Sequence, residues 1–105
     1  MFNMPSKLKA LQEALGLSDK DMADYLGVDV TVFREAKAGT KELSAHGVAI
    51  VLDSLGFVKF SDAAMMLLTK KAREKLIAAR KRQALTIAQK KALSALATKY
   101  STERK

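Results

Sequence analysis

Four glycines stand directly after apolar stripes of helical spacing, and this feature constrains the fold more than any other. The four are Gly16, Gly27, Gly39 and Gly56. The first stripe consists of Leu8, Leu11 and Leu15, which repeat at intervals of three and four residues. Glycine adopts the left-handed conformation that ends a helix at low energetic cost. The pattern therefore predicts four short helices before residue 58, and hence an all-α protein.

Polar residues at three helix starts support the same division. Ser18, Asp29 and Ser44 each precede an apolar stripe, where a side chain commonly caps the first turn. We therefore expect the third helix to cover about residues 29–38. The connections between these helices are short, as in a compact bundle.

The sequence changes after Phe57, because residues 58–105 contain neither Gly nor Pro. We expect Ser61 to cap a helix whose apolar positions are Ala64, Met65, Leu68, Ala72, Leu76 and Ala79. A second stripe follows at Leu85, Ala88, Ala92, Leu96 and Tyr100. The segment from Thr86 to Gln89 has the form of a capping box, which favours a break near residues 83–86. One continuous helix is the alternative, so the sequence divides into 1–58 and a helical extension, 59–105.

Charge is distributed unevenly between these two parts. Residues 1–58 hold 6 Lys and Arg against 8 Asp and Glu, a net charge of −2, whereas residues 59–105 hold 13 against 3, a net charge of +10. An excess of this size predicts a polyanionic partner, with nucleic acid favoured over an anionic membrane surface.

Several classes of protein are disfavoured by the composition. The chain has no Cys and one histidine, His46, so we expect no metal site, no cofactor, no catalytic site and a surface position for His46. The longest apolar run, residues 63–68, is too short to span a membrane. With no signal peptide visible, we expect a cytoplasmic protein.

The stretch from Ser18 to Gly39 contains a helix–turn–helix pattern. Ala23 is small enough for a close helix crossing, and Gly27, four residues later, suits the tight turn. The stretch reads Asp19-x-x-Met22-Ala23-x-x-Leu26-Gly27-Val28-Asp29-x-x-Val32-Phe33-x-x-Ala36-x-x-Gly39. It resembles the lambda-repressor/Cro-type, or XRE-like, helix–turn–helix family over residues 6–57. That family usually has Gln at the position of Asp19 and Trp at the position of Ala36.

The resemblance implies a lambda-repressor-like bundle of four to five short helices, to which the composition adds a basic C-terminal helical extension outside the resemblance. It also implies that residues 29–38 enter the major groove of double-stranded DNA. The expected base contacts are Val30, Thr31, Arg34 and Glu35. The expected backbone contacts within the resemblance are Lys20, Lys37 and Lys41. The charge of the extension, independently of the resemblance, predicts that it holds the DNA backbone while the third helix selects the sequence. The cations expected to do so are Lys70, Lys71, Arg73, Lys75, Arg80, Lys81, Arg82, Lys90 and Lys91.

Proteins of this family usually bind as dimers, so we also expect a homodimer. The stripe that contains Met65, Ala72 and Leu76 has two interpretations, a dimer seam or packing against the chain's own helices. The sequence does not decide between them.

The leading hypothesis is a sequence-specific DNA-binding transcriptional regulator of the phage, plasmid or prokaryotic type. The alternative is a protein-interaction adaptor or inhibitor that keeps the helix–turn–helix as a scaffold without reading DNA. Acidic residues around the second and third helices, among them Asp21 and Asp24, favour the alternative.

Overall fold

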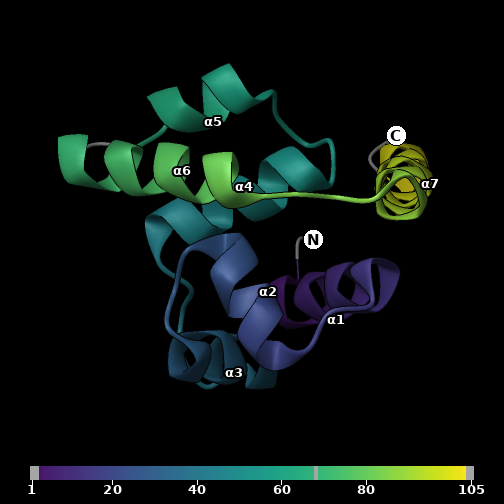
Figure 1. Ribbon diagram of the computed structural model, residues 1–105, viewed down its shortest axis with the longest axis horizontal. Coiled ribbons are helices and arrows are strands. Elements are labelled where there is room, and N and C mark those ends of the chain that lie inside the picture. Colours follow the sequence, from purple (N-terminus) through teal and green to yellow (C-terminus); the bar gives the residue numbers. More distant parts are fainter. Residues whose placement is uncertain (1–2, 68, 104–105) are drawn as a thin grey trace.

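The computed structural model describes residues 3–67 and 69–103, and within those ranges it is all-helical (Figure 1). The helices are α1 (Met4–Leu15), α2 (Asp19–Leu26), α3 (Val30–Ala38), α4 (Ala45–Ser54), α5 (Phe60–Met65), α6 (Lys70–Arg82) and α7 (Ile87–Glu103). The all-α prediction is therefore confirmed.

The first four helices end where the glycines predicted. Gly16, Gly27, Gly39 and Gly56 have φ angles of 64°, 71°, 81° and 75°, the left-handed region in which a side chain would be strained. The hydroxyl of Ser18 accepts a hydrogen bond from the backbone N–H of Asp21 at 3.2 Å, as expected of a cap. Asp29 and Ser44 occupy cap positions, but neither side chain makes the expected capping bond.

The extension is divided more finely than expected. The predicted break at residues 83–86 is confirmed: Thr86 N–H donates to Gln89 Oε1 at 2.9 Å and Gln89 N–H donates to Thr86 Oγ1 at 3.1 Å, a reciprocal capping box. One continuous helix is therefore excluded.

The continuous helix expected from Ser61 to about residue 82 is also wrong. It breaks between α5 and α6, and Thr69 Oγ1 caps α6 by accepting from Ala72 N–H at 3.1 Å. The break lets Ala63 and Leu67 enter the core while α6 changes direction to cover both α4 and α2. Met65, expected in the apolar stripe, is instead 80% exposed, and Leu68 lies outside the described residues.

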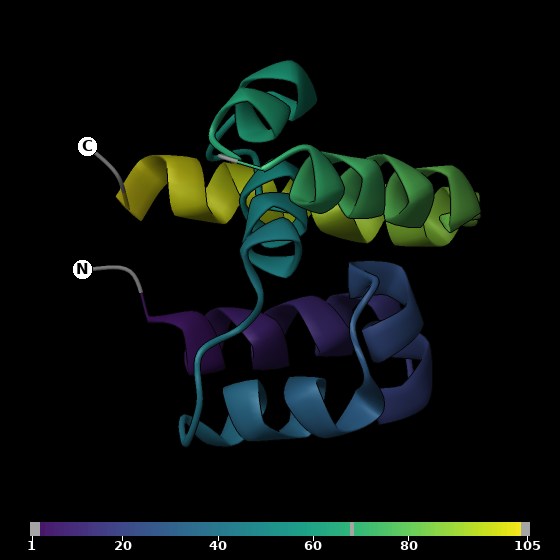
Figure 2. The same ribbon diagram turned by 90° about the vertical axis from the view of Figure 1, so that its left-hand side faces the viewer.

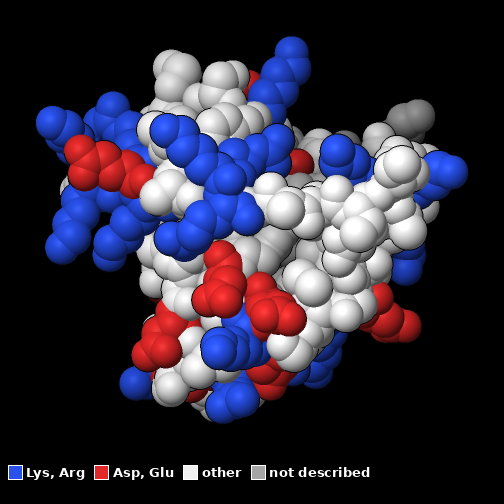
Figure 3. Space-filling model, viewed as in Figure 1, with Lys and Arg blue, Asp and Glu red and all other residues white. Residues whose placement is uncertain are grey.

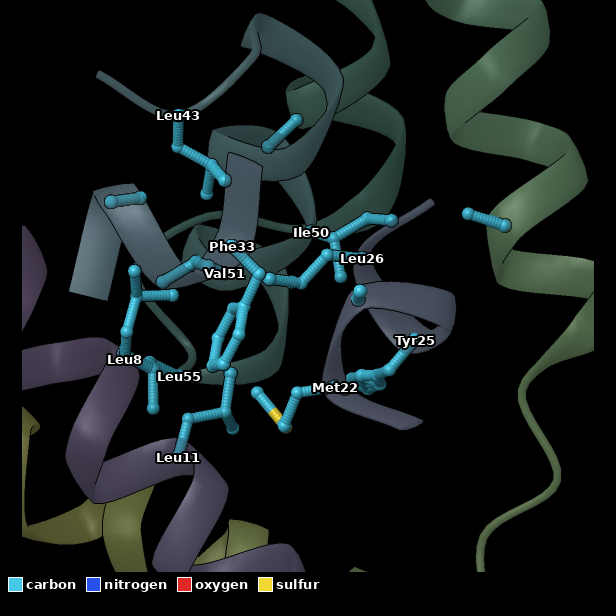
Figure 4. Packing of buried hydrophobic residues seen from close by; sticks show 14 of the residues in the cluster. Leu8, Leu11, Met22, Tyr25, Leu26, Phe33, Leu43, Ile50, Val51 and Leu55 are labelled. Atoms are coloured by element: carbon cyan, nitrogen blue, oxygen red, sulfur yellow. The ribbon is translucent and has the colours of Figure 1, made fainter. Parts of the chain in front are cut away.

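The hydrophobic core lies among α1, α2, α3 and α4. Figure 4 shows Phe33 in the centre, with Leu8, Leu11 and Met22 around it. Leu76, Ala79 and Tyr100, from α6 and α7, belong to the same buried cluster. The apolar stripe of α6 therefore packs inside the chain, and Leu76 and Ala79 are not available as a dimer seam.

Helix α2 lies between α3 and α6. It packs against α3 on one side and α6 on another, while α7 packs against α1. Figures 1 and 2 show α3 at the bottom of the molecule and α6 well above it, with α2 at an intermediate height.

Candidate nucleic-acid interface

The junction of α2 and α3 is built around Gly27. Val28 N–H donates to Ala23 O at 3.0 Å and Gly27 N–H donates to Asp24 O at 3.2 Å, which ends α2 in a tight left-handed turn. Ala23 is 2% exposed and Phe33 is fully buried, so the two helices meet closely through small and aromatic side chains. The inner face of α3 is thereby fixed, and its outer face remains at the surface.

Most of the residues expected to bind DNA lie on or beside that outer face. Thr31 and Arg34 are exposed one turn apart, and Val30, Glu35 and Lys37 are half-buried. The remaining expected residues are Lys41 after α3, Lys20 in the first turn of α2, and Arg80, Lys81 and Arg82 at the end of α6.

Asp19 links three helices at the edge of this surface. Its Oδ1 accepts from Lys37 Nζ at 2.7 Å and from Gln12 Nε2 at 2.9 Å, and its Oδ2 accepts from Arg34 Nε at 3.2 Å. Lys37 Nζ also donates to Gln12 Oε1 at 3.1 Å. Hydrogen bonds from Lys37, and then from Gln12, lower the pKa of Asp19 to about 2.

These contacts change the electrostatic character of α3. Arg34 and Lys37 share the carboxylate of Asp19, and Lys41 pairs with Glu35 at 3.4 Å. The surface is therefore partly neutralised within the chain. Arg34 uses its Nε atom for the ion pair, and in the part of the chain that the structure describes neither of its Nη groups has a hydrogen-bond partner.

The three basic residues at the end of α6 are not equivalent. Arg80 Nη1 lies 3.2 Å from Asp53 Oδ2, and its guanidinium stands 5.3 Å from the ring centre of Phe60. Burial raises the pKa of Asp53, and Arg80 opposes that rise. Arg80 therefore joins α6 to α4 and α5. Lys81 and Arg82 are exposed and have no ion pair among the described residues.

His46 was expected at the surface, and this expectation is wrong. The side chain is 6% exposed, and its Nε2–H donates to the carbonyl oxygen of Gly27 at 2.7 Å. Because His46 precedes the buried Ile50 by one helical turn, it lies on the inner face of α4 and reaches the α2–α3 turn. That spacing was the one sequence signal that could have indicated its burial.

The α2–α3 turn is also in contact with α6. A Cβ atom added at Gly27 would lie 2.8 Å from the Cβ of Ala79, so glycine is needed here for close approach as well as for its φ angle. Gln83 Nε2 donates to Tyr25 O at 3.1 Å, just before the turn. These contacts of Ala79 and Gln83 leave no signal in the local sequence, because each joins residues far apart in the chain.

The surface charge follows this arrangement. In Figure 3 the blue side chains gather over α6, and red side chains lie below them over α2. A groove of about 620 Å³ lies between α2 and the connection from α6 to α7, lined in part by Asp21, Asp24, Arg82 and Gln83. Acidic and basic residues thus meet along the boundary between α2 and the extension.

Within residues 3–67 and 69–103, no helix is long and apolar enough to cross a membrane and no group of three or more metal-ligating side chains is present. Comparison with protein-family models, with curated protein sequences and with solved structures finds no match to this chain.

Proposed function

We propose that this protein is a sequence-specific double-stranded-DNA-binding transcriptional regulator of the phage, plasmid or prokaryotic type, acting in the cytoplasm. In this proposal the first four helices form a lambda-repressor-like helix–turn–helix unit, and α3 enters the major groove. The proposal rests on the helix–turn–helix resemblance and on the geometry of α2 and α3.

One observation carries the proposal: α2 and α3 cross tightly at Gly27 while Thr31 and Arg34 stay exposed on the outer face of α3. A helix that recognises base edges in the major groove needs side chains that reach those edges from a face left free by the rest of the protein. The ion pair from Arg34 Nε to Asp19 orients the guanidinium and leaves its Nη groups to donate to guanine O6 and N7.

The other residues have supporting roles in this proposal. Val30 or Thr31 meets a thymine methyl group, and Glu35 accepts from cytosine N4. Lys20, Lys37 and Lys41 contact phosphates, as do Lys81 and Arg82. Arg80, which is engaged with Asp53, serves mainly to hold α6 in place.

The proposal includes a homodimer, since regulators of this kind read two half-sites. Leu76 and Ala79 are buried within the chain, so the contact between the two subunits must lie on another surface.

In-vitro selection from a random duplex library tests the proposal directly. We expect a consensus sequence, and we expect Arg34→Ala to relax the preference at one base position at a cost of about 1–3 kcal/mol. Lys59→Ala, which removes an exposed cation at the start of α5, is the matched control and should leave the consensus unchanged. Failure of the wild-type protein to select any consensus would end the proposal.

The second candidate is a protein-interaction adaptor, and the groove beside Asp21 and Asp24 favours it. An adaptor would use this acidic boundary for a basic partner and would retain no random duplex DNA at moderate salt. Retention followed by a consensus distinguishes the regulator from the adaptor.

A further inference from the structure

Helix α6 carries a large charge that the rest of the chain does not balance. Its 13 residues include seven Lys and Arg and a single acidic residue, Glu74. Arg80 pairs with Asp53. Among the described residues the other six have no ion pair or side-chain hydrogen bond. They are Lys70, Lys71, Arg73, Lys75, Lys81 and Arg82.

The unbalanced charge is least favourable in the first turn of the helix. The N-terminal end of a helix is its positive end, where acidic residues are stabilising. Here the first turn contains no acidic residue and begins with Lys70 and Lys71. Lys71 and Lys75 are also one turn apart, a spacing at which like charges repel. Lys81 and Arg82, in contrast, stand at the end where cations are stabilising.

The opposite arrangement holds on α3. Arg34, Lys37 and Lys41 each have a carboxylate partner within the chain. A phosphate group must therefore compete with Asp19 or Glu35 for these cations, whereas in the described part of the chain no carboxylate forms an ion pair with the exposed cations at the start of α6.

The structure also fixes α6 relative to α3. Ala79 packs directly on Gly27, and Gln83, the residue after α6, donates to Tyr25 O, so the end of α6 is attached to the α2–α3 turn at the end of α2. Leu76 is fully buried on the same face. The cations at the start of α6 thus project from a helix that is held firmly against the helix–turn–helix.

We propose that Lys70, Lys71, Arg73 and Lys75, here called the α6 cationic face, form a second DNA contact that binds the phosphate backbone without sequence preference. The choice of DNA as the polyanion rests on the function proposed above. Bound phosphates supply the negative charge that the first turn lacks, so binding relieves the repulsion within α6. The α6 cationic face provides most of the salt-dependent affinity, and α3 provides the sequence preference.

The double variant Lys70→Glu/Lys71→Glu tests this assignment without loss of the fold. Glutamate in the first turn complements the positive helix end, so we expect a thermal midpoint above that of the wild type. We also expect affinity for a random duplex to fall by roughly tenfold or more, and the slope of log affinity against log salt to become shallower by about two. A fall in the thermal midpoint would contradict the charge argument.

The matched control is Lys9→Glu/Lys59→Glu, which makes the same change in net charge at exposed positions on α1 and before α5. The proposal requires that the control keep most of the wild-type affinity and salt slope. If both variants lost the same affinity for random duplex DNA, the effect would be due to net charge alone, and the assignment of the contact to α6 would be wrong.

The outcomes also separate this inference from the proposed function. If selection yields a consensus and the Lys70→Glu/Lys71→Glu variant binds random duplex as tightly as the control, the inference is wrong and the proposed function stands. If no consensus emerges but random-duplex binding depends on Lys70 and Lys71, the phosphate contact of α6 stands and the proposed sequence-specific function is wrong. Binding of the wild type to phosphatidylserine vesicles and not to duplex DNA would overturn the inference.

Discussion

At the scale of single residues, Asp19 determines the properties of the α3 surface. A carboxylate at the start of α2 would be expected to repel a phosphate. Here it instead accepts hydrogen bonds from Lys37, Gln12 and Arg34, and so joins α1, α2 and α3. The same residue therefore lowers the positive charge of the surface and orients Arg34.

The pKa of Asp19 makes its contribution to stability dependent on pH. The folded value of about 2 lies below the usual 3.8, so the contribution is complete above pH 3.8 and is lost as the pH falls toward 2. Asp19→Asn should lower the thermal midpoint by a few degrees at pH 7, and the difference from wild type should close between about pH 4 and pH 2. Thermal melts followed by circular dichroism across this range check the prediction.

Asp24→Asn, an exposed change on the same helix with no ion pair among the described residues, is the control and should show no such convergence. Asp19→Asn should also raise the affinity for random duplex DNA, since Arg34 and Lys37 lose their shared carboxylate. A midpoint difference that persists unchanged to pH 2 would contradict the role of the charge.

At the scale of elements, the α2–α3 turn is held from two other helices. His46 of α4 donates to the Gly27 carbonyl, and Ala79 of α6 occupies the space beside the Gly27 Cα atom. Gly27 thus serves two purposes, a left-handed turn and a close helix contact. Gly16 serves the first alone, because no atom lies within 4 Å of an added Cβ there.

This contrast predicts different costs for two similar substitutions. Gly16→Ala should destabilise the protein by about 1–2 kcal/mol through its φ angle. Gly27→Ala adds a clash with Ala79 and should cost a further 1–3 kcal/mol or so, in the range of overpacked cores. Urea denaturation gives both values. Adding Ala79→Gly to Gly27→Ala should restore part of the free energy of unfolding that the clash removes. Equal losses of stability in Gly16→Ala and Gly27→Ala would show that α6 does not pack against the α2–α3 turn.

At the scale of the whole molecule, α6 and α7 share a core with the first four helices. Leu76, Ala79 and Tyr100 lie in one hydrophobic cluster with Leu8 and Phe33. Gln89 Nε2 donates to Leu15 O at 2.9 Å, which attaches α7 to the end of α1. Helices α6 and α7 therefore complete the packing of the helices that precede them.

Truncation after residue 58 should consequently destabilise the remaining helices. The cut exposes the surfaces beneath Leu76 and Tyr100, and burial of each large apolar side chain contributes about 1.5–3 kcal/mol. We expect the fragment 1–58 to melt at a much lower temperature than the full chain, with a broader transition in circular dichroism. A fragment that melted at the temperature of the full chain would show that residues 59–105 are an independent appendage.

Local patterns in the sequence determined the all-α class, the four glycine-ended helices and the capping box at Thr86 and Gln89, because each of these depends on residues within one or two helical turns. Tertiary structure decided the break before α6, the burial of His46, the ion pairs of Asp19 and the engagement of Arg80 with Asp53. These features join residues that are distant in the chain or depend on how one helix lies over another. The sequence supplies the charges. Which of them are paired is decided by how α2 crosses α3 and by how α6 packs against the α2–α3 turn.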